Sequence, residues 1–384
     1  MTKIGIDASF LRKPDTGLGQ VTLNFLRKLS EISNGEEVEF FLYLEEDVKL
    51  KLPKNFHKVV FLPPYKRDDI FRAIWWQKYL LPKKVQADGC EVFLSLFQCA
   101  TIMPKSIKHV MLVHDVLLEF FPDYLSNWRK AYAWKLLKKA IGQADKIVAI
   151  SHRTEKDLVN TLGIDPKKIT VAYIDVAEIF KQEVSVAESQ RILKKYKLKA
   201  GYIYSGGGLE VRKNVESVVR AYKWLLERYP EDEKFPKLVI SGKLLPQLAP
   251  LVTDVEKLVQ ELGLKKQVAI LGWVPQKDLP ALYRNAGLFV YPSHYEGFGL
   301  PVLEAMSQGV PTVTSKTSSL PEVGSDSVLY CDPNDFKDVA MVMRNVLSND
   351  HLQAALSLKG QERATHFSWE KFTQKMLNII SEMN

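Results

Sequence analysis

Glu296-Gly297-Phe298-Gly299-Leu300-Pro301-Val302-Leu303-Glu304 places two carboxylates around a glycine loop and a proline that can open a helix. Proline has a preset φ and no N–H, so Pro301 fits the first helical position, and residues 302–306 can continue the helix. No Ser, Thr, Asp or Asn directly precedes Pro301 to cap it, which leaves the first-turn N–H groups open to an outside anion. The sequence therefore predicts a phosphate-binding helix end, with Glu296 in the preceding loop and Glu304 about one turn inside the helix.

The glycines of this stretch fit the same prediction. Gly297 and Gly299 carry no Cβ, so the backbone can approach a ligand closely or adopt a positive φ. The two glutamates would point at different parts of an elongated ligand, such as a sugar joined to a phosphate. Glycine and proline also mark ordinary turns, and Glu304 could be a solvated helix residue. Other parts of the sequence are therefore needed to distinguish a ligand site from an ordinary turn.

The segment resembles the E-x7-E motif of the retaining, nucleotide-sugar-dependent glycosyltransferases of family four, which have the GT-B architecture. The likeness extends over 291–301, 304–306 and 309–311. In that family the first glutamate contacts the transferred sugar and the second binds the ribose hydroxyls, which implies these roles for Glu296 and Glu304. The diphosphate would then be held by the backbone amides of Gly297, Phe298, Gly299 and Leu300.

Length and composition are those of an ordinary globular protein. The chain has 384 residues, 46% hydrophobic and 26% charged, which is enough for two to three domains. Its three cysteines, Cys90, Cys99 and Cys331, form no C-x-x-C pair, which disfavours a disulfide framework or a zinc site and favours the cytosol. No apolar leader precedes Lys3–Ile6 and no apolar run reaches about 18 residues, so we expect neither a signal peptide nor a membrane span.

Short apolar segments alternate with amphipathic helical ones, which predicts an α/β protein with two doubly wound parallel sheets. The expected strands of the first sheet are 3–7, 39–44, 92–95, 110–113 and 146–150. Those of the second sheet are 202–205, 238–241, 268–271, 288–291 and 311–314.

The polar segment Lys181–Lys199 reads as a linker with a short helix, and we place the domain boundary there. The prediction is an N-terminal Rossmann-like domain at 1–182, which would bind the acceptor, and a C-terminal Rossmann-like domain at 183–366, which would bind the donor. By resemblance to GT-B enzymes, a final helix at 367–384 would cross back onto the first domain. The two domains would face each other across a central cleft, where ligands bind such sheets.

Other nucleotide-binding motifs fit poorly. After the first strand, Gly17-Leu18-Gly19 is followed by Thr22 where G-x-G-x-x-G needs a glycine, and Gly17 lies ten positions after Asp7. No G-x-x-x-x-G-K-[ST] occurs, so a P-loop is excluded. The resemblance instead implies that Gly17 and Gly19 lie near the donor diphosphate and the acceptor; the alternative is a plain strand-to-helix turn.

A second glycine loop, 206–208, precedes Arg212-Lys213-Asn214. Fixed cations at such a place would stabilise the charge that grows on a departing diphosphate. The resemblance assigns Lys213 as the phosphate lysine, but many relatives carry an arginine where this chain has Gly207, so Arg212 would supply part of that charge. Alternatively, both cations are solvated surface charges.

His114-Asp115 follows the apolar run 110–113 and therefore marks the carboxyl end of a strand. The resemblance places such a histidine close to the transferred sugar, where His114 would orient it. A structural hydrogen bond is the alternative. Asp115 could fix the loop or hold the imidazole.

The expected chemistry is a retaining transfer without metal or cofactor. A retaining glycosidase needs two carboxyl groups about 5 Å apart. Glu296 is the one obvious carboxylate near the proposed sugar, which favours a same-face displacement in which the leaving phosphate takes the acceptor's proton. No D-x-D motif flanks the site, and the basic pair with the helix end can do a metal's electrostatic work.

The donor base would be read around Gly272, Trp273 and Val274, while Glu304 would bind the ribose of the same nucleoside. GDP-mannose is our expectation for the donor because of the resemblance to bacterial mannosyltransferases of surface polysaccharide assembly. The acceptor, the linkage and the oligomeric state do not follow from the sequence.

The formal net charge is +8, and part of it is interleaved with aromatic residues at 65–84 and 128–139. Such a surface can seat a protein peripherally on an anionic membrane, on the inner face in this case. Alternatively, Trp75, Leu80 and Leu81 pack on the sheet while the cations face water. No nucleic-acid motif accompanies the charge, so we expect no nucleic-acid partner.

The sequence thus predicts a retaining hexosyltransferase that moves a hexose from a nucleotide-diphospho-sugar to a sugar or lipid-linked acceptor. It would serve in surface polysaccharide or glycolipid assembly. A sugar phosphorylase, a sugar-nucleotide epimerase or a catalytically silent nucleotide-binding scaffold are the alternatives.

Overall fold

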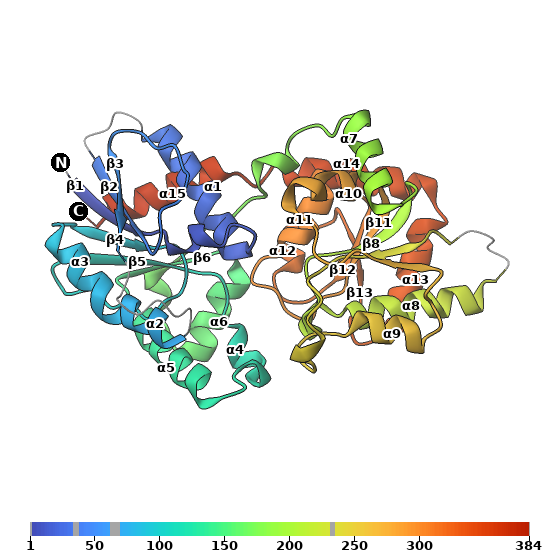
Figure 1. Cartoon of the computed structure of the whole chain (residues 1–384), viewed down its shortest axis with the longest axis horizontal. Helices are drawn as coiled ribbons and strands as arrows, with labels where there is room; N and C mark the ends of the chain where they lie inside the picture. Colours follow the sequence, from blue (N-terminus) through green and yellow to red (C-terminus); the bar gives the residue numbers. More distant parts are fainter. Residues whose placement is uncertain (1, 34–37, 62–69, 231–234, 384) are drawn as a thin grey trace. The chain divides into compact units, whose positions relative to one another are not determined.

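A computed structural model describes residues 2–33, 38–61, 70–230 and 235–383. The chain divides into two compact units, which are drawn in Figure 1. Unit 1 comprises Met1–Ile174 and Ser368–Asn384, and unit 2 comprises Asp175–Phe367.

Unit 1 contains a seven-stranded parallel sheet in the order β3-β2-β1-β4-β5-β6-β7. Its strands are β1 (Thr2–Asp7), β2 (Val38–Leu44), β3 (Phe56–Val60), β4 (Val92–Ser95), β5 (Lys108–Val113), β6 (Lys146–Ala149) and β7 (Ile169–Val171). Its helices are α1 (Gly17–Ile32), α2 (Ile70–Trp75), α3 (Leu81–Ala87), α4 (Leu117–Phe120), α5 (Trp128–Gln143), α6 (His152–Leu162) and α15 (Trp369–Ser381). Short helical turns are η1 (Ser9–Arg12), η2 (Trp76–Leu80), η3 (Pro122–Tyr124) and η4 (Pro166–Lys168).

Unit 2 contains a six-stranded parallel sheet in the order β10-β9-β8-β11-β12-β13. Its strands are β8 (Tyr202–Ser205), β9 (Leu238–Ile240), β10 (Val268–Ile270), β11 (Ala286–Tyr291), β12 (Thr312–Ser315) and β13 (Leu329–Cys331). Its helices are α7 (Val186–Tyr196), α8 (Val215–Arg228), α9 (Val255–Glu261), α10 (Leu279–Arg284), α11 (Leu300–Ser307), α12 (Leu320–Gly324), α13 (Phe336–Leu347) and α14 (Asp350–Ala364). Short helical turns are η5 (Glu178–Phe180), η6 (Val211–Lys213), η7 (Pro246–Leu248) and η8 (Gln276–Asp278).

Burial on both faces explains the strand sequences. Every residue of β4, β8 and β12 is buried, as expected for central strands of a parallel sheet that helices cover on both sides. The predicted fold class of two parallel α/β sheets is confirmed, and each of the ten predicted strands is present within two residues of its expected ends. The structure adds β3, β7 and β13, each of which lies at a sheet edge.

The last helix of the described chain belongs to unit 1. Ser368 caps α15, since its Oγ accepts from the N–H of Glu370 at 3.1 Å. The helix buries Phe372 and Met376, and the Phe372 ring packs edge-on against Phe25 of α1, with 5.8 Å between the centroids. Figure 1 shows this red helix beside the blue helix α1.

The segment that precedes α7 belongs to unit 2. The side-chain amide of Gln308 donates to the Phe180 carbonyl at 2.6 Å, and the Phe180 ring packs on Tyr283. These contacts explain why the units divide at 174/175, whereas the sequence placed the boundary at 182/183. Helix α7, which we expected in a linker, is also tied to unit 2, because Arg191 and Tyr196 donate to the buried Asp278 at 2.9 Å each.

Two further sequence predictions concern the cysteines and the membrane. Cys90, Cys99 and Cys331 are buried free thiols. Across the described ranges, we find no helix whose length and apolar character would let it cross a bilayer.

Candidate active site

The glycine-proline stretch forms a loop that leads into α11. The helix begins at Leu300, one residue before the proline, after Gly299 with φ +113°. A Cβ at Gly299 would meet Leu320 at 2.8 Å, so only glycine fits there. No side chain caps the helix, as predicted, and no described residue accepts a hydrogen bond from the N–H of Gly299 or Leu300. The helix entrance therefore presents two unused donors.

The second glycine loop packs directly against this helix entrance. Gly207 and Gly208 follow β8 with φ of +100° and +116°. A Cβ at Gly207 would lie 2.7 Å from Pro301 Cγ in the first turn of α11. The two elements that the sequence proposed for phosphate binding are therefore side by side in unit 2, although they lie about 90 residues apart in the chain.

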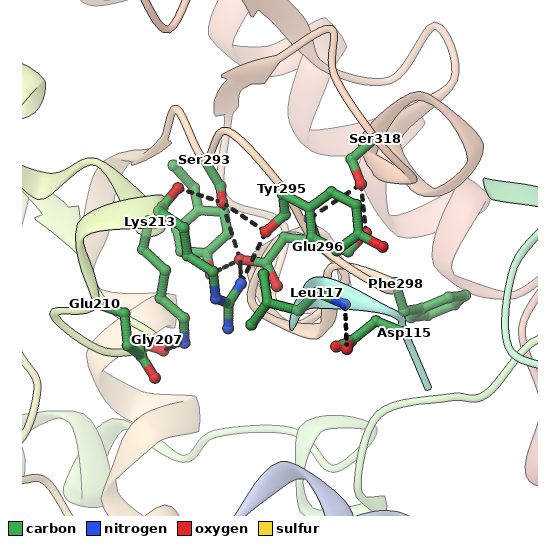
Figure 2. A network of polar contacts seen from close by, with 12 residues as sticks. Asp115, Leu117, Gly207, Glu210, Lys213, Ser293, Tyr295, Glu296, Phe298 and Ser318 are labelled. Carbon is green, nitrogen blue, oxygen red and sulfur yellow. Dashed lines mark hydrogen bonds and ion pairs between the residues drawn. The ribbon is translucent and has the colours of Figure 1, made fainter. Parts of the chain in front are cut away.

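Lys213 reaches back over the second glycine loop. Its Nζ donates to the Gly207 carbonyl and lies 3.1 Å from Glu210 Oε2, as Figure 2 shows. Its side chain is only 13% exposed. Lys213 therefore stands beside the glycine loop with its side chain largely shielded from solvent.

Glu296 is held through one of its two carboxylate oxygens (Figure 2). Its Oε1 accepts from Tyr291 Oη at 2.7 Å and Ser293 Oγ at 3.0 Å, and lies 2.9 Å from Arg212 Nη1. Burial acts to raise the pKa of Glu296, but the charges of Arg212 and Lys213 and the hydrogen bonds outweigh it, so the pKa lies below its ordinary value. Glu296 is therefore an ionised carboxylate in a largely buried position.

The Arg212 guanidinium forms an ion pair with Glu296 and is largely shielded from solvent. The same Nη1 also donates to the Tyr295 carbonyl at 2.8 Å. Burial acts to lower the pKa of Arg212, but the Glu296 charge raises it above its ordinary value. The sequence placed Arg212 at the diphosphate, whereas in the structure its charge is directed at the glutamate.

Glu304 lies on α11 in a partly buried position. Its Oε2 accepts from Tyr283 Oη at 3.0 Å. Burial raises the pKa of Glu304 to about 7, although the Tyr283 hydrogen bond and the Lys213 charge act to lower it. Near neutral pH this carboxyl is therefore close to its titration midpoint.

The predicted nucleoside-binding residues follow β10. Gly272 has φ +66° and its carbonyl accepts from Gly242 N–H at 2.9 Å. Val274 is buried, but the Trp273 side chain is 54% exposed. A large aromatic ring left open beside a proposed base site is suited to stacking.

In unit 1, His114 lies at the carboxyl end of β5, as predicted, and is buried. Its Nε2 lies 3.0 Å from the Leu96 carbonyl, which can only accept, so Nε2 carries the hydrogen. Burial lowers the pKa of His114 to about 4 despite that hydrogen bond. The ring is therefore neutral at pH 7, and its Nδ1 is a hydrogen-bond acceptor.

Asp115 fixes the next turn, because its Oδ1 accepts from Leu117 N–H at 3.1 Å. Gly17 and Gly19 lie in the first turn of α1 rather than in a preceding loop. The Gly19 N–H donates to Thr16 Oγ1 at 3.1 Å, and a Cβ there would meet the Lys13 carbonyl oxygen at 2.0 Å. Close packing alone thus explains Gly19, and its N–H already has an acceptor.

Several polar residues of the site were not assigned roles from the sequence. Asn214 is buried and donates to the Pro292 and Pro333 carbonyls at 3.1 and 2.8 Å, which anchors the Arg212-Lys213 turn. Asn214 has a φ of +60°, in the left-handed region where asparagine is enriched among non-glycine residues. The asparagine itself is therefore the signal that the sequence offered. Phe298, by contrast, turns its ring into the interior, where it packs on Phe367.

No group of three or more His, Cys, Asp or Glu side chains that could hold a metal ion occurs in the part of the chain that the structure covers. The predicted roles of the site residues toward a sugar nucleotide stay predictions at this point.

Comparison with known proteins identifies the family. Residues 16–174 match the family described as Glycosyltransferase Family 4, and residues 187–363 match Glycosyl transferases group 1. O-antigen chain mannosyltransferase B of Escherichia coli is 34% identical over 277 residues, which cover 71% of this chain and 69% of that protein. The serotype-specific mannosyltransferase WbdA of E. coli is 32% identical over 68% of this chain, which spans only 32% of that relative's length.

Solved structures agree on the fold. The crystal structure of WaaG, a glycosyltransferase involved in lipopolysaccharide biosynthesis, matches with a TM-score of 0.75 at 16% identity and covers 99% of both chains. This chain is therefore a member of the GT-B glycosyltransferases of family four, with mannosyltransferases among its relatives.

Proposed function

We propose that this glycosyltransferase is a retaining, metal-independent hexosyltransferase that transfers mannose from GDP-mannose. The observation that carries the proposal is the packing of the Gly207 loop, with Lys213 beside it, against the uncapped entrance of α11. An ammonium group and free backbone donors converge there, which suits a diphosphate. The mannosyltransferase names of the E. coli relatives support mannose as the sugar and O-antigen or related surface polysaccharide as the product.

In the proposed reaction, the bond between the sugar C1 and the diphosphate oxygen breaks and its electron pair goes to the phosphate. The acceptor hydroxyl forms the new bond to C1 on the same face, and its proton goes to the departing phosphate oxygen. Lys213 and the N–H groups of Gly299 and Leu300 stabilise the charge that develops on the leaving group. These fixed charges replace a metal ion, and the donor substrate is the sole small molecule that the reaction needs besides the acceptor.

The remaining residues would recognise the substrates. Glu296 offers an ionised carboxylate to the sugar hydroxyls, and Glu304 accepts hydrogen bonds from the ribose. Trp273, with its neighbours Gly272 and Val274, receives the base. In unit 1, which we infer to bind the sugar or lipid-linked acceptor, His114 offers Nδ1 to a sugar hydroxyl and Gly17 remains a candidate contact.

The experiment is a donor panel. Thermal shifts with GDP, UDP, ADP and dTDP and with their sugars identify the nucleotide, and release of nucleoside diphosphate with a mannosyl acceptor measures transfer in the presence of EDTA. NMR of the product reports the anomeric configuration. No stabilisation by any nucleotide would overturn the donor site, inversion would overturn the mechanism, and sugar 1-phosphate formation with orthophosphate would favour a phosphorylase.

The pKa of Glu304 leads to a pH prediction for donor binding. If the ionised carboxylate accepts from the ribose, each donor bound below about pH 7 displaces one proton. Affinity for the intact sugar nucleotide should therefore fall about tenfold per pH unit below pH 7 and level off above it. Calorimetry in two buffers at pH 6 checks this, with Glu304→Gln as the control that loses the slope. A flat wild-type profile would contradict it.

The proposal extends to an anionic membrane surface on unit 1. Trp75 is exposed beside the buried Trp76, and on α5 the Trp128 side chain is 68% exposed. Arg129 lies over the Trp128 ring at 5.8 Å, and the Phe71 ring of α2 lies 5.9 Å from the Trp128 ring. Of the basic cluster that the sequence pointed to, residues 65–67 lie outside the described residues.

The membrane prediction is tested with vesicles. Arg129→Glu with Lys130→Glu should weaken binding to phosphatidylglycerol vesicles about 30-fold or more, since each cation near such a surface contributes about 1 kcal/mol. The same reversal at the exposed pair Lys265 and Lys266 of unit 2 is the matched control. Equal loss in both variants, or equal binding to neutral vesicles, would contradict a docking face on unit 1.

A further inference from the structure

Tyr291 ends β11 and lies against the Gly207 loop of unit 2. It is 1% exposed, and its ring stacks on Phe289 with 5.9 Å between the centroids. A Cβ at Gly207 would come within 3.3 Å of Tyr291 Cε2, so the ring also supports the glycine loop. A buried tyrosine hydroxyl needs a partner, and this one donates to Glu296 Oε1 at 2.7 Å.

The contacts of Glu296 differ between its two carboxylate oxygens. All three side chains that hold the carboxylate, from Tyr291, Ser293 and Arg212, reach Oε1. Within the described chain, Oε2 has no hydrogen-bond partner, and it is not among the polar atoms that are both buried and unpartnered. One oxygen is therefore anchored and the other keeps access to solvent.

Tyr291 is the least shared of these donors. The single hydrogen of the Ser293 hydroxyl is divided among Glu296, the Arg212 carbonyl at 3.0 Å and the Tyr295 carbonyl at 3.3 Å. Arg212 Nη1 divides its donors between Glu296 and the Tyr295 carbonyl. Burial, reinforced by the Glu296 charge, raises the pKa of Tyr291 well above its ordinary value, so its hydroxyl stays a donor throughout the working pH range.

The backbone of Glu296 is fixed as well. Its N–H donates to Ser318 Oγ at 3.0 Å, and its carbonyl accepts from Ser319 Oγ at 2.8 Å. With the main chain held, the direction of Oε2 depends on the side-chain torsions, and the anchoring of Oε1 removes that freedom.

We propose that Tyr291 is a positioning residue for glycosyl transfer, which anchors Glu296 through Oε1 so that Oε2 is presented to the sugar. The inference rests on the proposed function. It adds to that function a distinction between the two carboxylate oxygens of Glu296, because Oε1 is anchored and Oε2 contacts the sugar. It also gives the ring a second task, which is to keep the glycine loop and Glu296 in register.

The test compares Tyr291→Phe with Tyr202→Phe. Tyr202 lies on the neighbouring strand β8, is 2% exposed, and donates its hydroxyl to the Leu282 carbonyl, so its loss removes a similar buried hydrogen bond away from Glu296. Tyr291→Phe should lower kcat about 10- to 100-fold with the donor KM within about threefold. The acidic limb of its kcat profile should move to higher pH, because Glu296 has lost a donor to its charged form. Tyr202→Phe should keep kcat within twofold.

A double-mutant cycle and a titration make the result decisive. In a Glu296→Gln background, Tyr291→Phe should cost no further activity. NMR titration of ¹³C-labelled glutamate, with Glu296→Gln for assignment, should show a higher Glu296 pKa in Tyr291→Phe and no change in Tyr202→Phe.

Each outcome is interpretable. A wild-type enzyme that transfers no sugar would overturn the proposed function, and the titration would still test the anchoring of Glu296. An active wild type with Tyr291→Phe unchanged in kcat, or additive effects in the cycle, would overturn the positioning role. If Tyr291→Phe does not fold, Ser293→Ala removes another donor to the same oxygen and is judged by the same criteria.

Discussion

Replacement of Lys213 by alanine is expected to lower kcat about 100- to 1,000-fold, by analogy with the loss of one preorganised donor to a developing charge. Lys213 is the side-chain cation beside the Gly207 loop, whereas Arg212 is directed at Glu296. Its charge acts most strongly when the sugar–phosphate bond is breaking, so kcat should fall more than the donor affinity. Initial rates of nucleoside diphosphate release against donor concentration measure this.

Two variants control the Lys213 experiment. Lys213→Arg keeps the charge and should retain more activity than alanine. Lys223→Ala on α8 removes a lysine that likewise lies near a glutamate, with 3.6 Å between Lys223 Nζ and Glu227 Oε1, and should leave kcat unchanged. A kcat for Lys213→Ala within a few-fold of wild type would assign the leaving-group role elsewhere.

Glu296→Gln is expected to lower kcat by a similar factor and also to destabilise the fold. The substitution keeps the shape but removes the charge that balances Arg212, whose side chain is largely buried. Loss of one partner of a buried ion pair costs about 3–5 kcal/mol in the free energy of unfolding, because the other charge is left uncompensated. Denaturant unfolding together with initial rates separates the two effects.

The double variant Arg212→Met, Glu296→Gln provides the contrast. Removal of both charges should recover much of the lost stability, since well-packed neutral residues can replace a buried ion pair. Activity should stay low if Glu296 acts on the sugar. Recovery of activity along with stability would mean that Glu296 matters only through its ion pair.

The sequence predicted the central strands well and missed strands at the sheet edges. The central strand β4 is buried throughout, and its sequence is apolar up to Ser95 at its end. The edge strand β3 alternates instead, with Lys58 and Val60 exposed, and β7 and β13 are only three residues long. A half-exposed edge strand lacks the apolar run that marks a buried parallel strand, which is why β3 was missed. Length alone does not explain β7 and β13, because β9 and β10 are equally short and were predicted.

For the candidate site, sequence motifs predicted where the residues lie along the chain, but they did not predict which side chains contact one another. The glycine loops, Lys213 and both glutamates could be located because glycine, proline and charge leave local signals. The direction of Arg212 toward Glu296, and the hydroxyls of Tyr283 and Tyr291 on the two glutamates, depend on contacts between separate strands and helices. Such contacts need the folded coordinates, because tyrosine at a strand end is equally typical of a packed core.

Helix α15 makes unit 1 discontinuous in sequence, since unit 2 is inserted between the seventh strand and this last helix. During translation, the whole of unit 2 leaves the ribosome before the helix that covers Phe25 has been synthesised. The flank of α1 that packs on α15 therefore stays uncovered by that helix until the end of synthesis.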